Sequence, residues 1–197
     1  MNIHLLPTEN RKGGMPGFLP ELERPESDRT ITVKEFGRLV LRPITPADEK
    51  PMIRFHESLS EEGIYLRYFE HISLDTRTLH ERLARVCTNS ADSYAIVAER
   101  HETSHHPAEI LAVGRLTTTE KPKSASFALL MSDQAMTTEL PEHLLTRQIE
   151  IARVQGFEAV EGELLVCDHD TVTLCRKLGF QTRTILEEGF VRVNLAI

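Results

Sequence analysis

The chain has 197 residues, 40% of them hydrophobic and 27% charged, and its 30 acidic residues outnumber its 23 Lys and Arg to give a formal net charge of −7. This length favours one globular domain. The acidic balance argues against nucleic-acid binding, which needs clustered Lys and Arg against the phosphates. Because the sequence shows no apolar run near eighteen residues and no signal-peptide pattern, we expect no membrane span and no secretion.

The cysteines indicate the redox compartment. Cys87, Cys167 and Cys175 form no CxxC pair and are odd in number. Reduced thiols in a cytoplasmic protein fit this pattern better than a disulfide framework does. Each thiol is expected to serve mainly as a small buried side chain, with nucleophilic chemistry as the alternative.

Residues 1–30 are rich in Gly, Pro and charges of both signs and show no apolar period. They are interpreted as a flexible leader, and the folded domain is expected over residues 31–197. Alternating apolar residues begin at Ile31, and Gly37 permits a turn before a return strand over 39–44. The domain is therefore expected to open with a β-hairpin.

A helix is predicted next. Thr45 and Asp48 have the spacing of a capping box, and Pro46 suits the first helical position. Pro51 lacks a backbone donor, so it is expected to bend or restart the helix near Lys50.

Two more helices are expected before the main sheet. Ser60 can cap a helix that runs to about Ile72. Asp75 can cap a third helix, whose apolar face is formed by Leu79, Leu83 and Val86.

Three β-rich segments follow, separated by polar loops. They cover residues 94–98, 110–118 and 124–131. An antiparallel meander is the simplest arrangement of three such neighbours.

The C-terminal part alternates helices with strands. One helix is expected to end at Gly156 and another at Gly179, each followed by Phe, with a strand over 159–166 between them. A final hairpin is expected around Gly189. This order of elements predicts an α/β or α+β fold.

The loop that begins at His101 contains a literal HExxH pattern, with Glu102 and His105. In zinc peptidases a helix presents both histidines to the metal. Here the pattern is polar and Pro107 follows it, so a solvent-facing loop is expected and no metal site is predicted.

The run from Phe127 to Phe180 consists of strand, loop, helix, strand and helix, and ends Leu178-Gly179-Phe180. It resembles the acyl-CoA core of the GCN5-related N-acetyltransferases (GNAT). Residues 37–49 and 59–69 resemble the start of that domain in bacterial protein lysine acetyltransferases, and residues 112–116 resemble its third strand. The resemblance covers residues 31–197.

The resemblance implies a mixed, mostly antiparallel sheet flanked by helices, and an acetyl group passed from acetyl-CoA to a primary amine. The acceptor would be a protein lysine or a small molecule, and a homodimer is compatible with it. The main chain of Leu129, Leu130 and Met131 would support the thioester and pantetheine. A loop into the next helix would hold the pyrophosphate.

That loop departs from the family pattern. Met136, Glu139 and Pro141 occupy the positions of Gln or Arg and of two small residues, so the glycine backbone is replaced by a carboxylate and by a residue without N–H. Thr137 and Thr138, just before Glu139 and Leu140, supply the hydroxyls for phosphate. Two interpretations stay open: CoA binding through the strand backbone, or a helix start neutralised from within by Glu139 and Glu142.

The catalytic positions also differ. Ser124 and Ser126 stand where a strand Glu is common, so neither offers a carboxylate. The resemblance places Asp168 at the position of an Asn and Cys175 at that of a Tyr proton donor. Asp168 and its neighbour His169 are candidate proton acceptors, with helix capping as the alternative role of Asp168. Two functions remain: an N-acetyltransferase, or a non-catalytic GNAT-like domain that senses a ligand or binds a protein.

Overall fold

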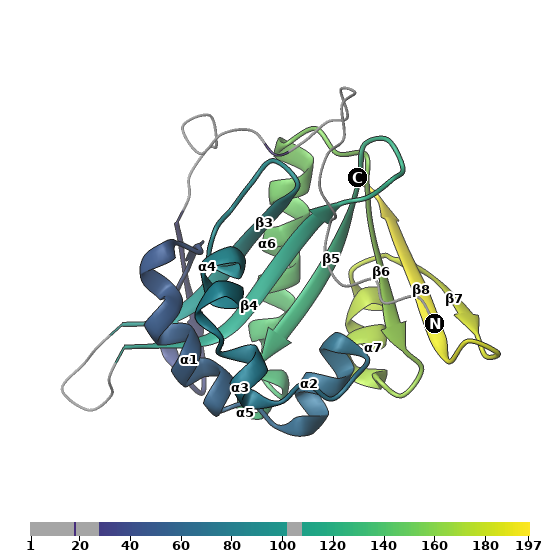
Figure 1. The fold of residues 1–197 in the computed structure, drawn as a ribbon. Helices are drawn as coiled ribbons and strands as arrows, with labels where there is room; N and C mark the ends of the chain where they lie inside the picture. The colour runs from purple at the N-terminus through teal and green to yellow at the C-terminus, as the bar shows by residue number, and fades with distance from the viewer. Residues whose placement is uncertain (1–17, 19–27, 102–107) are drawn as a thin grey trace.

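The computed structural model describes Phe18 and residues 28–101 and 108–197. A single eight-stranded sheet runs through this part of the chain in the order β1-β2-β3-β4-β5-β6-β8-β7 (Figure 1). All neighbouring strands are antiparallel except β5 and β6, which are parallel. The strands are β1 (Arg29–Val33), β2 (Gly37–Pro43), β3 (Ser93–Arg100), β4 (Glu109–Thr118), β5 (Ser124–Met131), β6 (Ala159–Leu165), β7 (Gln181–Ile185) and β8 (Phe190–Ala196).

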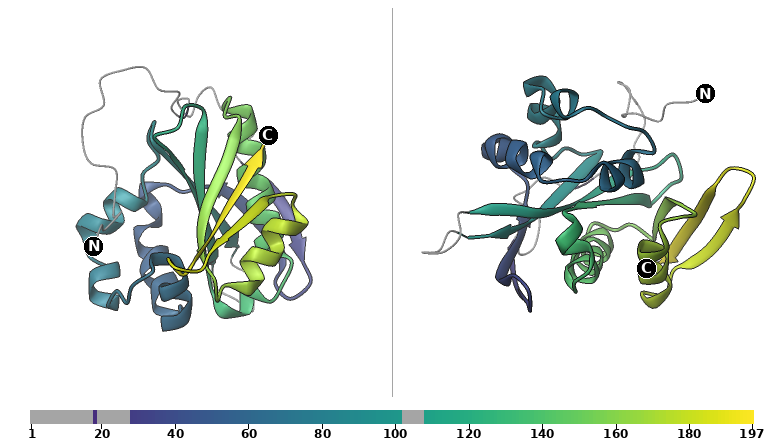
Figure 2. Two further views of the ribbon diagram at one scale, coloured as in Figure 1. Left: turned by 90° about the vertical axis from the view of Figure 1, so that its right-hand side faces the viewer. Right: turned by 90° about the horizontal axis from the view of Figure 1, so that it is seen from below.

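Helices cover both faces of this sheet (Figure 2). One face carries α1 (Glu49–Glu57), α2 (Glu61–Tyr68), α3 (Leu74–Arg77) and α4 (His80–Val86), after a short 3₁₀ turn over Pro46–Asp48. The other face carries α6 (Leu140–Val154) and α7 (His169–Lys177), and the short α5 (Asp133–Met136) precedes α6. Each face has its own apolar core, so the sheet is buried on both sides.

The predicted hairpin, meander and C-terminal hairpin are confirmed, and with them the mostly antiparallel α/β architecture. β1 begins at Arg29, two residues before the expected domain boundary. Phe18, which was assigned to the leader, is 4% exposed and packs on Tyr94 and Phe157 at centroid distances of 5.8 and 5.0 Å. Residues 1–17 and 19–27 of the expected leader lie outside the described part of the chain.

The first helix begins as its sequence signals indicate. The Thr45 N–H donates to the Asp48 carboxylate at 2.8 Å, while the Asp48 N–H donates to the Thr45 carbonyl at 2.9 Å. The α-helix starts at Glu49, which places Pro51 in its first turn, where a missing N–H costs no intrahelical bond. Pro51 is thus accommodated by the restart from a 3₁₀ turn into an α-helix.

The next helices are only partly as predicted. Ser60 caps α2, because its Oγ accepts the Gly63 N–H at 3.0 Å. The prediction of a third helix capped by Asp75 is wrong: Ser73 caps α3 through the Thr76 N–H, and Asp75 lies inside that one-turn helix. A separate helix, α4, follows, and Leu79 at its start is 57% exposed rather than part of an apolar face.

The two Gly-Phe helix endings share one geometry. Gly156 and Gly179 have φ values of 81° and 89°, the left-handed region that favours glycine. The following Phe157 and Phe180 donate their N–H groups back to Ala152 and Cys175, at 3.0 and 2.9 Å. Both rings are buried, so each ending turns the chain and anchors it in the core.

No helix in the described part of the chain is long and apolar enough to cross a membrane.

Candidate active site

The sheet opens between β5 and β6. The two strands pair at three positions, from Ser124 opposite Ala159 to Ser126 opposite Glu161, and then separate (Figure 1). β5 continues to Met131 and β6 to Leu165 without pairing with each other. We call this divergence the fork. Because β6 has left, the edge of β5 over residues 127–131 offers main-chain groups to a ligand.

The point where β6 separates from β5 is packed by aromatic side chains of the core beneath α6 and α7. The Phe127 ring lies against Gly162, where an added Cβ would come within 2.8 Å of its Cε1 atom. Phe180 packs edge-on to Phe127 at 5.5 Å. Gly162 is therefore required by the close approach of an aromatic ring. This packing holds β6 at the point where it leaves β5.

Helix α2 crosses the open end of the fork. At its start, the Ser60 hydroxyl donates to the Asp133 carboxylate at 2.7 Å, just beyond β5. At its end, Phe69 packs edge-on against Phe190 of β8 at 5.1 Å. Phe190 is paired with Leu165, the last residue of β6. α2 therefore connects the tips of the two separated strands.

The main-chain segment that the sequence assigns to the thioester lies on the open edge. Leu129 packs partly against the core under α6, Leu130 is buried under α1–α4, and Met131 is buried at the strand's end. The side chains of these three residues thus pack in the two apolar cores. What faces the fork is their backbone.

Two carboxylates on β6 were not singled out from the sequence. Val160 and Leu164 point into the core beneath α6 and α7, so Glu161 and Glu163 point to the opposite face. Glu161 pairs with Lys121 at 2.5 Å, and Glu163 pairs with Arg192 at 2.7 Å. Alternation along β6 is the signal by which the sequence could have placed them beside the fork.

The loop between β5 and α6 is held by its own hydroxyls. Thr137 Oγ1 donates to the Gln134 carbonyl at 3.2 Å, and Thr138 Oγ1 donates to the Ala135 carbonyl at 2.8 Å. Thr138 Oγ1 also accepts the Leu140 N–H at 3.1 Å. The hydroxyls expected to face phosphate therefore already bond to the loop's own backbone.

The acidic residues at the start of α6 make no capping hydrogen bond, although Glu142 lies in the first turn, where the helix dipole favours a negative charge. Glu139 is exposed and makes no capping bond, and the Thr138 hydroxyl takes the first helical N–H instead. The Glu142 carboxylate pairs with Lys177 of α7 at 2.5 Å. Met136 packs half-buried against the core, and Leu140 is completely buried.

Lys177 is a residue that sequence reasoning missed. No Lys or Arg lies between Asp133 and His143 in the sequence, so the loop looked purely acidic. The fold supplies a cation from the end of the next helix, 35 residues further along the chain. No local pattern identifies it, because the contact depends on how α6 and α7 pack.

The three predicted catalytic residues lie on or just before α7. Asp168 is the N-cap, since its Oδ1 accepts the Thr171 N–H at 3.1 Å, and burial raises the pKa of its carboxyl group. His169 is the first helical residue and is exposed. Cys175 is completely buried, and this burial, with the nearby Asp168 charge, raises the pKa of its thiol to about 12. The thiol therefore stays protonated.

No group of His, Cys, Asp or Glu in the described ranges is arranged to hold a metal. Glu102 and His105 of the HExxH pattern lie outside those ranges. Among the thiols, Cys87 and Cys175 are buried and Cys167 is exposed. Burial, with the charges of Asp48 and Glu49, raises the pKa of Cys87 to about 11, which makes it a poor nucleophile.

No protein-family model matches the sequence. The structure is similar to the GNAT domain of S. lividans PAT, with 20% identity over 91% of this chain and 99% of that domain and a TM-score of 0.74. Mycobacterium smegmatis RimJ, solved with CoA-disulfide, matches at 11% identity over 88% of each chain, with a TM-score of 0.70.

The PaiA N-acetyltransferase of Thermoplasma acidophilum, solved with coenzyme A, matches at 12% identity over 81% of this chain and 99% of that one, with a TM-score of 0.62. All three span most of both chains. The forked sheet, the helices on its two faces and these likenesses together show that the chain has the GCN5-related N-acetyltransferase fold.

Proposed function

We propose that this protein transfers an acetyl group from acetyl-CoA to a primary amine, on a protein lysine or a small molecule. The observation that carries the proposal is the edge of β5 at the fork, where the main-chain groups of residues 127–131 do not pair with β6. Backbone N–H groups of this kind stabilise the oxyanion that forms when an amine attacks a thioester.

The reaction is a direct transfer. The amine nitrogen forms a bond to the thioester carbonyl carbon, the carbon–sulfur bond breaks, and the amine loses one proton while the leaving thiolate gains one. The backbone of Leu129, Leu130 and Met131 holds the thioester end of the substrate. The phosphates lie at the loop formed by Met136, Thr137, Thr138, Glu139 and Leu140, with Lys177 beside it.

The proton of the amine needs an acceptor near the fork. Asp168 and His169 are the acceptors that the resemblance suggests, and Glu163 is a third, since it lies on β6 beyond the last paired residue. Asp168 bonds to the Thr171 N–H, so it also fixes the start of α7. Cys175 has no exposed surface, and we assign it no proton transfer.

A second function is favoured by the loop itself. Its hydroxyls bond to backbone carbonyls, Glu139 projects a negative charge, and Lys177 is occupied by Glu142. These features weaken a phosphate site. The alternative is therefore a non-catalytic GNAT-like domain that uses the fork to sense a ligand or bind a protein.

Titration with acetyl-CoA separates the two. An enzyme should bind it saturably, and at a hundredfold Kd the folded state gains about 2.7 kcal/mol, visible as a rise in Tm. Radiolabelled acetyl transfer to a lysine-containing peptide and to a panel of small amines then tests catalysis. Absence of any Tm rise at millimolar acetyl-CoA would remove the enzyme function and leave the non-catalytic one.

Two variants test the loop directly. Glu139→Gly removes an exposed carboxylate and Glu142→Gln frees Lys177, so each should tighten acetyl-CoA binding several-fold by removing negative charge near the phosphates. Glu187→Gln, in the exposed turn between β7 and β8, is the matched control and should bind like wild type. Unchanged affinity in both loop variants would show that the phosphates lie elsewhere.

A further inference from the structure

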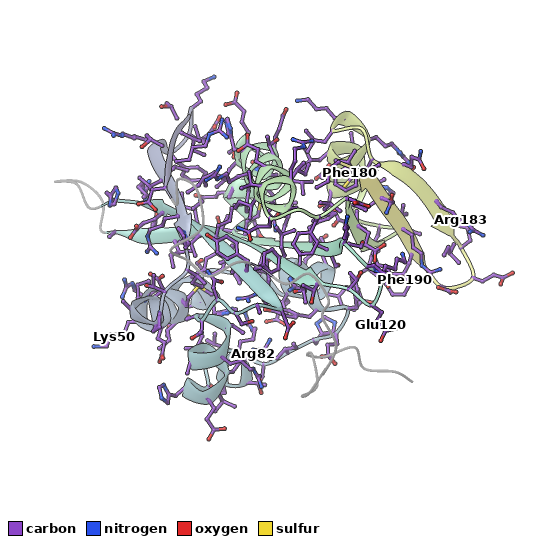
Figure 3. The ribbon with its side chains drawn as sticks, turned by 90° about the horizontal axis from the view of Figure 1, so that it is seen from above. Lys50, Arg82, Glu120, Phe180, Arg183 and Phe190 are labelled. Carbon is purple, nitrogen blue, oxygen red and sulfur yellow. The ribbon has the colours of Figure 1, made fainter. Side chains whose placement is uncertain are left out.

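A cluster of three arginines surrounds one tyrosine on the α1–α4 face of the sheet. The guanidinium carbon of Arg67, on α2, lies 4.9 Å from the Tyr68 ring centroid, and that of Arg82, on α4, lies 5.3 Å from it. Figure 3 shows Arg82 on the opposite side of the sheet from Phe180. Tyr68 packs against the core of this face, so it fixes both cations beside a rigid ring.

Arg115 brings the third positive charge from β4. It donates to the Ser93 hydroxyl at 2.7 Å and to the Val86 carbonyl, both of which are neutral acceptors. Burial and the charge of Arg67 lower the pKa of Arg115 to about 10. Burial, opposed by Tyr68, lowers the pKa of Arg67, and the Arg82 charge adds to that lowering. The three cations therefore repel one another in a partly dehydrated place.

No carboxylate in the described ranges forms an ion pair with Arg67, Arg82 or Arg115. Some arginines elsewhere do have carboxylate partners: Arg42 pairs with Asp48 and Glu99, and Arg29 pairs with Glu150. In a chain whose net charge is −7, these three grouped arginines form a local excess of positive charge. Grouped positive charges without counter-charges are costly unless an anion binds them.

The cluster lies next to the fork. Arg115 is paired with Ala128 on β5, two residues beyond Ser126, where pairing with β6 ends. Arg67 belongs to α2, the helix that connects the tips of the separated strands. The loop into α6, where CoA phosphates are proposed, belongs to the opposite face of the sheet. The cluster therefore lies on the α1–α4 side of the sheet, with β5 between Arg115 and the fork.

We propose that Arg67, Arg82 and Arg115 bind an anionic group of the acceptor, so that the amine substrate also carries a carboxylate or a phosphate. This inference rests on the proposed acetyl transfer for its meaning, but the anion site itself is testable without it. Guanidinium groups suit both ligands because they donate paired N–H bonds to two oxygens.

The first experiment measures anion binding by thermal shift with inorganic phosphate and with acetate, at constant ionic strength. We expect a saturable rise in Tm in wild type that disappears in Arg67→Gln and in Arg82→Gln. Arg183→Gln, an exposed arginine on β7, is the matched control and should respond like wild type. General salt effects act on all variants alike, so equal shifts in all four proteins would overturn the proposal.

The second experiment compares acceptors that differ only in the acidic group: lysine against cadaverine, and phosphoethanolamine against ethanolamine. Arg67→Gln should raise the KM of the preferred acidic acceptor at least tenfold and leave the KM of acetyl-CoA and of the acceptor without the acidic group unchanged. The preferred pair distinguishes carboxylate from phosphate. Equal use by wild type of acceptors with and without the acidic group would disprove this inference and leave acetyl transfer standing.

The anion site can also be confirmed while the proposed acetyl transfer fails. If acetyl-CoA fails to bind but phosphate still raises Tm through Arg67 and Arg82, the proposed function is lost and the anion site remains. If Arg67→Gln instead weakens acetyl-CoA binding, the cluster serves the phosphates of CoA, and our assignment to the acceptor is wrong.

Discussion

The side-chain amide of Gln148, on α6, lies directly against Gly114 of β4, so that a Cβ on this glycine would be 2.9 Å from Cδ of Gln148. Gln148 is 1% exposed, and neither its Oε1 nor its Nε2 has a hydrogen-bond partner among the described residues. Only a residue without a Cβ fits at position 114, because the Gln148 amide lies against it, and that amide makes no hydrogen bond with the described residues. A buried amide in this position opposes folding.

Replacing that amide should stabilise the protein. Gln148→Met keeps the length of the side chain and removes both unpaired polar atoms, so the free energy of unfolding should rise by about 1–3 kcal/mol. Urea denaturation measures it. Gln134→Met, at an exposed site on α5, is the control and should change little. A loss of stability in Gln148→Met would mean that the amide has a partner, such as a buried water.

Phe18 packs in the core although it precedes β1 in the chain. Its ring contacts Tyr94 and Phe157, and its N–H donates to the Ala91 carbonyl at 2.7 Å. Phe18→Ala should therefore lower the free energy of unfolding by about 3 kcal/mol, as is typical of a buried ring. Leu186→Ala, at an exposed site, should have almost no effect. Similar values for the two variants would show that Phe18 does not pack in solution.

His56 should make stability fall in mild acid. It is buried on α1, and burial together with the charges of Arg77 and Arg82 lowers its pKa from 6.5 to about 4. Between these two pH values the His56 imidazole is protonated in the unfolded chain but neutral in the folded chain. The contribution of neutral His56 to the free energy of unfolding is therefore complete above pH 6.5 and is lost as the pH falls toward 4. The loss amounts to about 3 kcal/mol.

Denaturation curves between pH 7 and 4 test this, with His56→Leu expected to flatten the pH dependence and His101→Gln, at an exposed position, expected to keep it. An unchanged slope in His56→Leu would assign the acid sensitivity to other groups.

Phe69 ends α2 in a strained conformation. Its φ is 62°, although it is not a glycine, and its ring holds Phe190 across the open end of the fork. Phe69→Ala removes the ring but keeps a non-glycine residue at positive φ, whereas Phe69→Gly removes the ring and relieves that backbone strain. The free energy of unfolding of the alanine variant should therefore be about 1 kcal/mol lower than that of the glycine variant. Thermal and urea unfolding of both variants measure this difference. Equal stabilities would show that the backbone relaxes once the ring is removed.

Local signals were sufficient for much of the fold. The Thr45–Asp48 box, the Ser60 cap and the two Gly-Phe endings each depend on residues within a few positions, so the sequence specifies them directly. The start of α3 was harder to predict because Ser73 and Asp75 both belong to residue types that cap helices. Only the packed structure shows that Ser73 prevails.

The site was less accessible from the sequence because its parts come from distant segments. Lys177 reaches Glu142 from 35 residues away. Arg67 meets Arg115 only after α2 has folded over β4 and β5. Such contacts have no local spacing, and they depend on the way helices pack on a sheet. The role of the β5 backbone is an expectation from the family resemblance, and it stays a proposal.

The fork also divides the sheet into two sets of strand ladders. β1 to β5 form one set of continuous ladders and β6 to β8 form another, joined by pairing at three positions. Because β5 and β6 pair at so few positions, we expect β6, β7 and β8 to unfold locally as one unit while β1 to β5 stay paired. Native-state hydrogen exchange would then show one opening energy shared by β6, β7 and β8, lower than that of β3 and β4. A ligand bound in the fork would join the two halves, and its first signature would be slower exchange along β6.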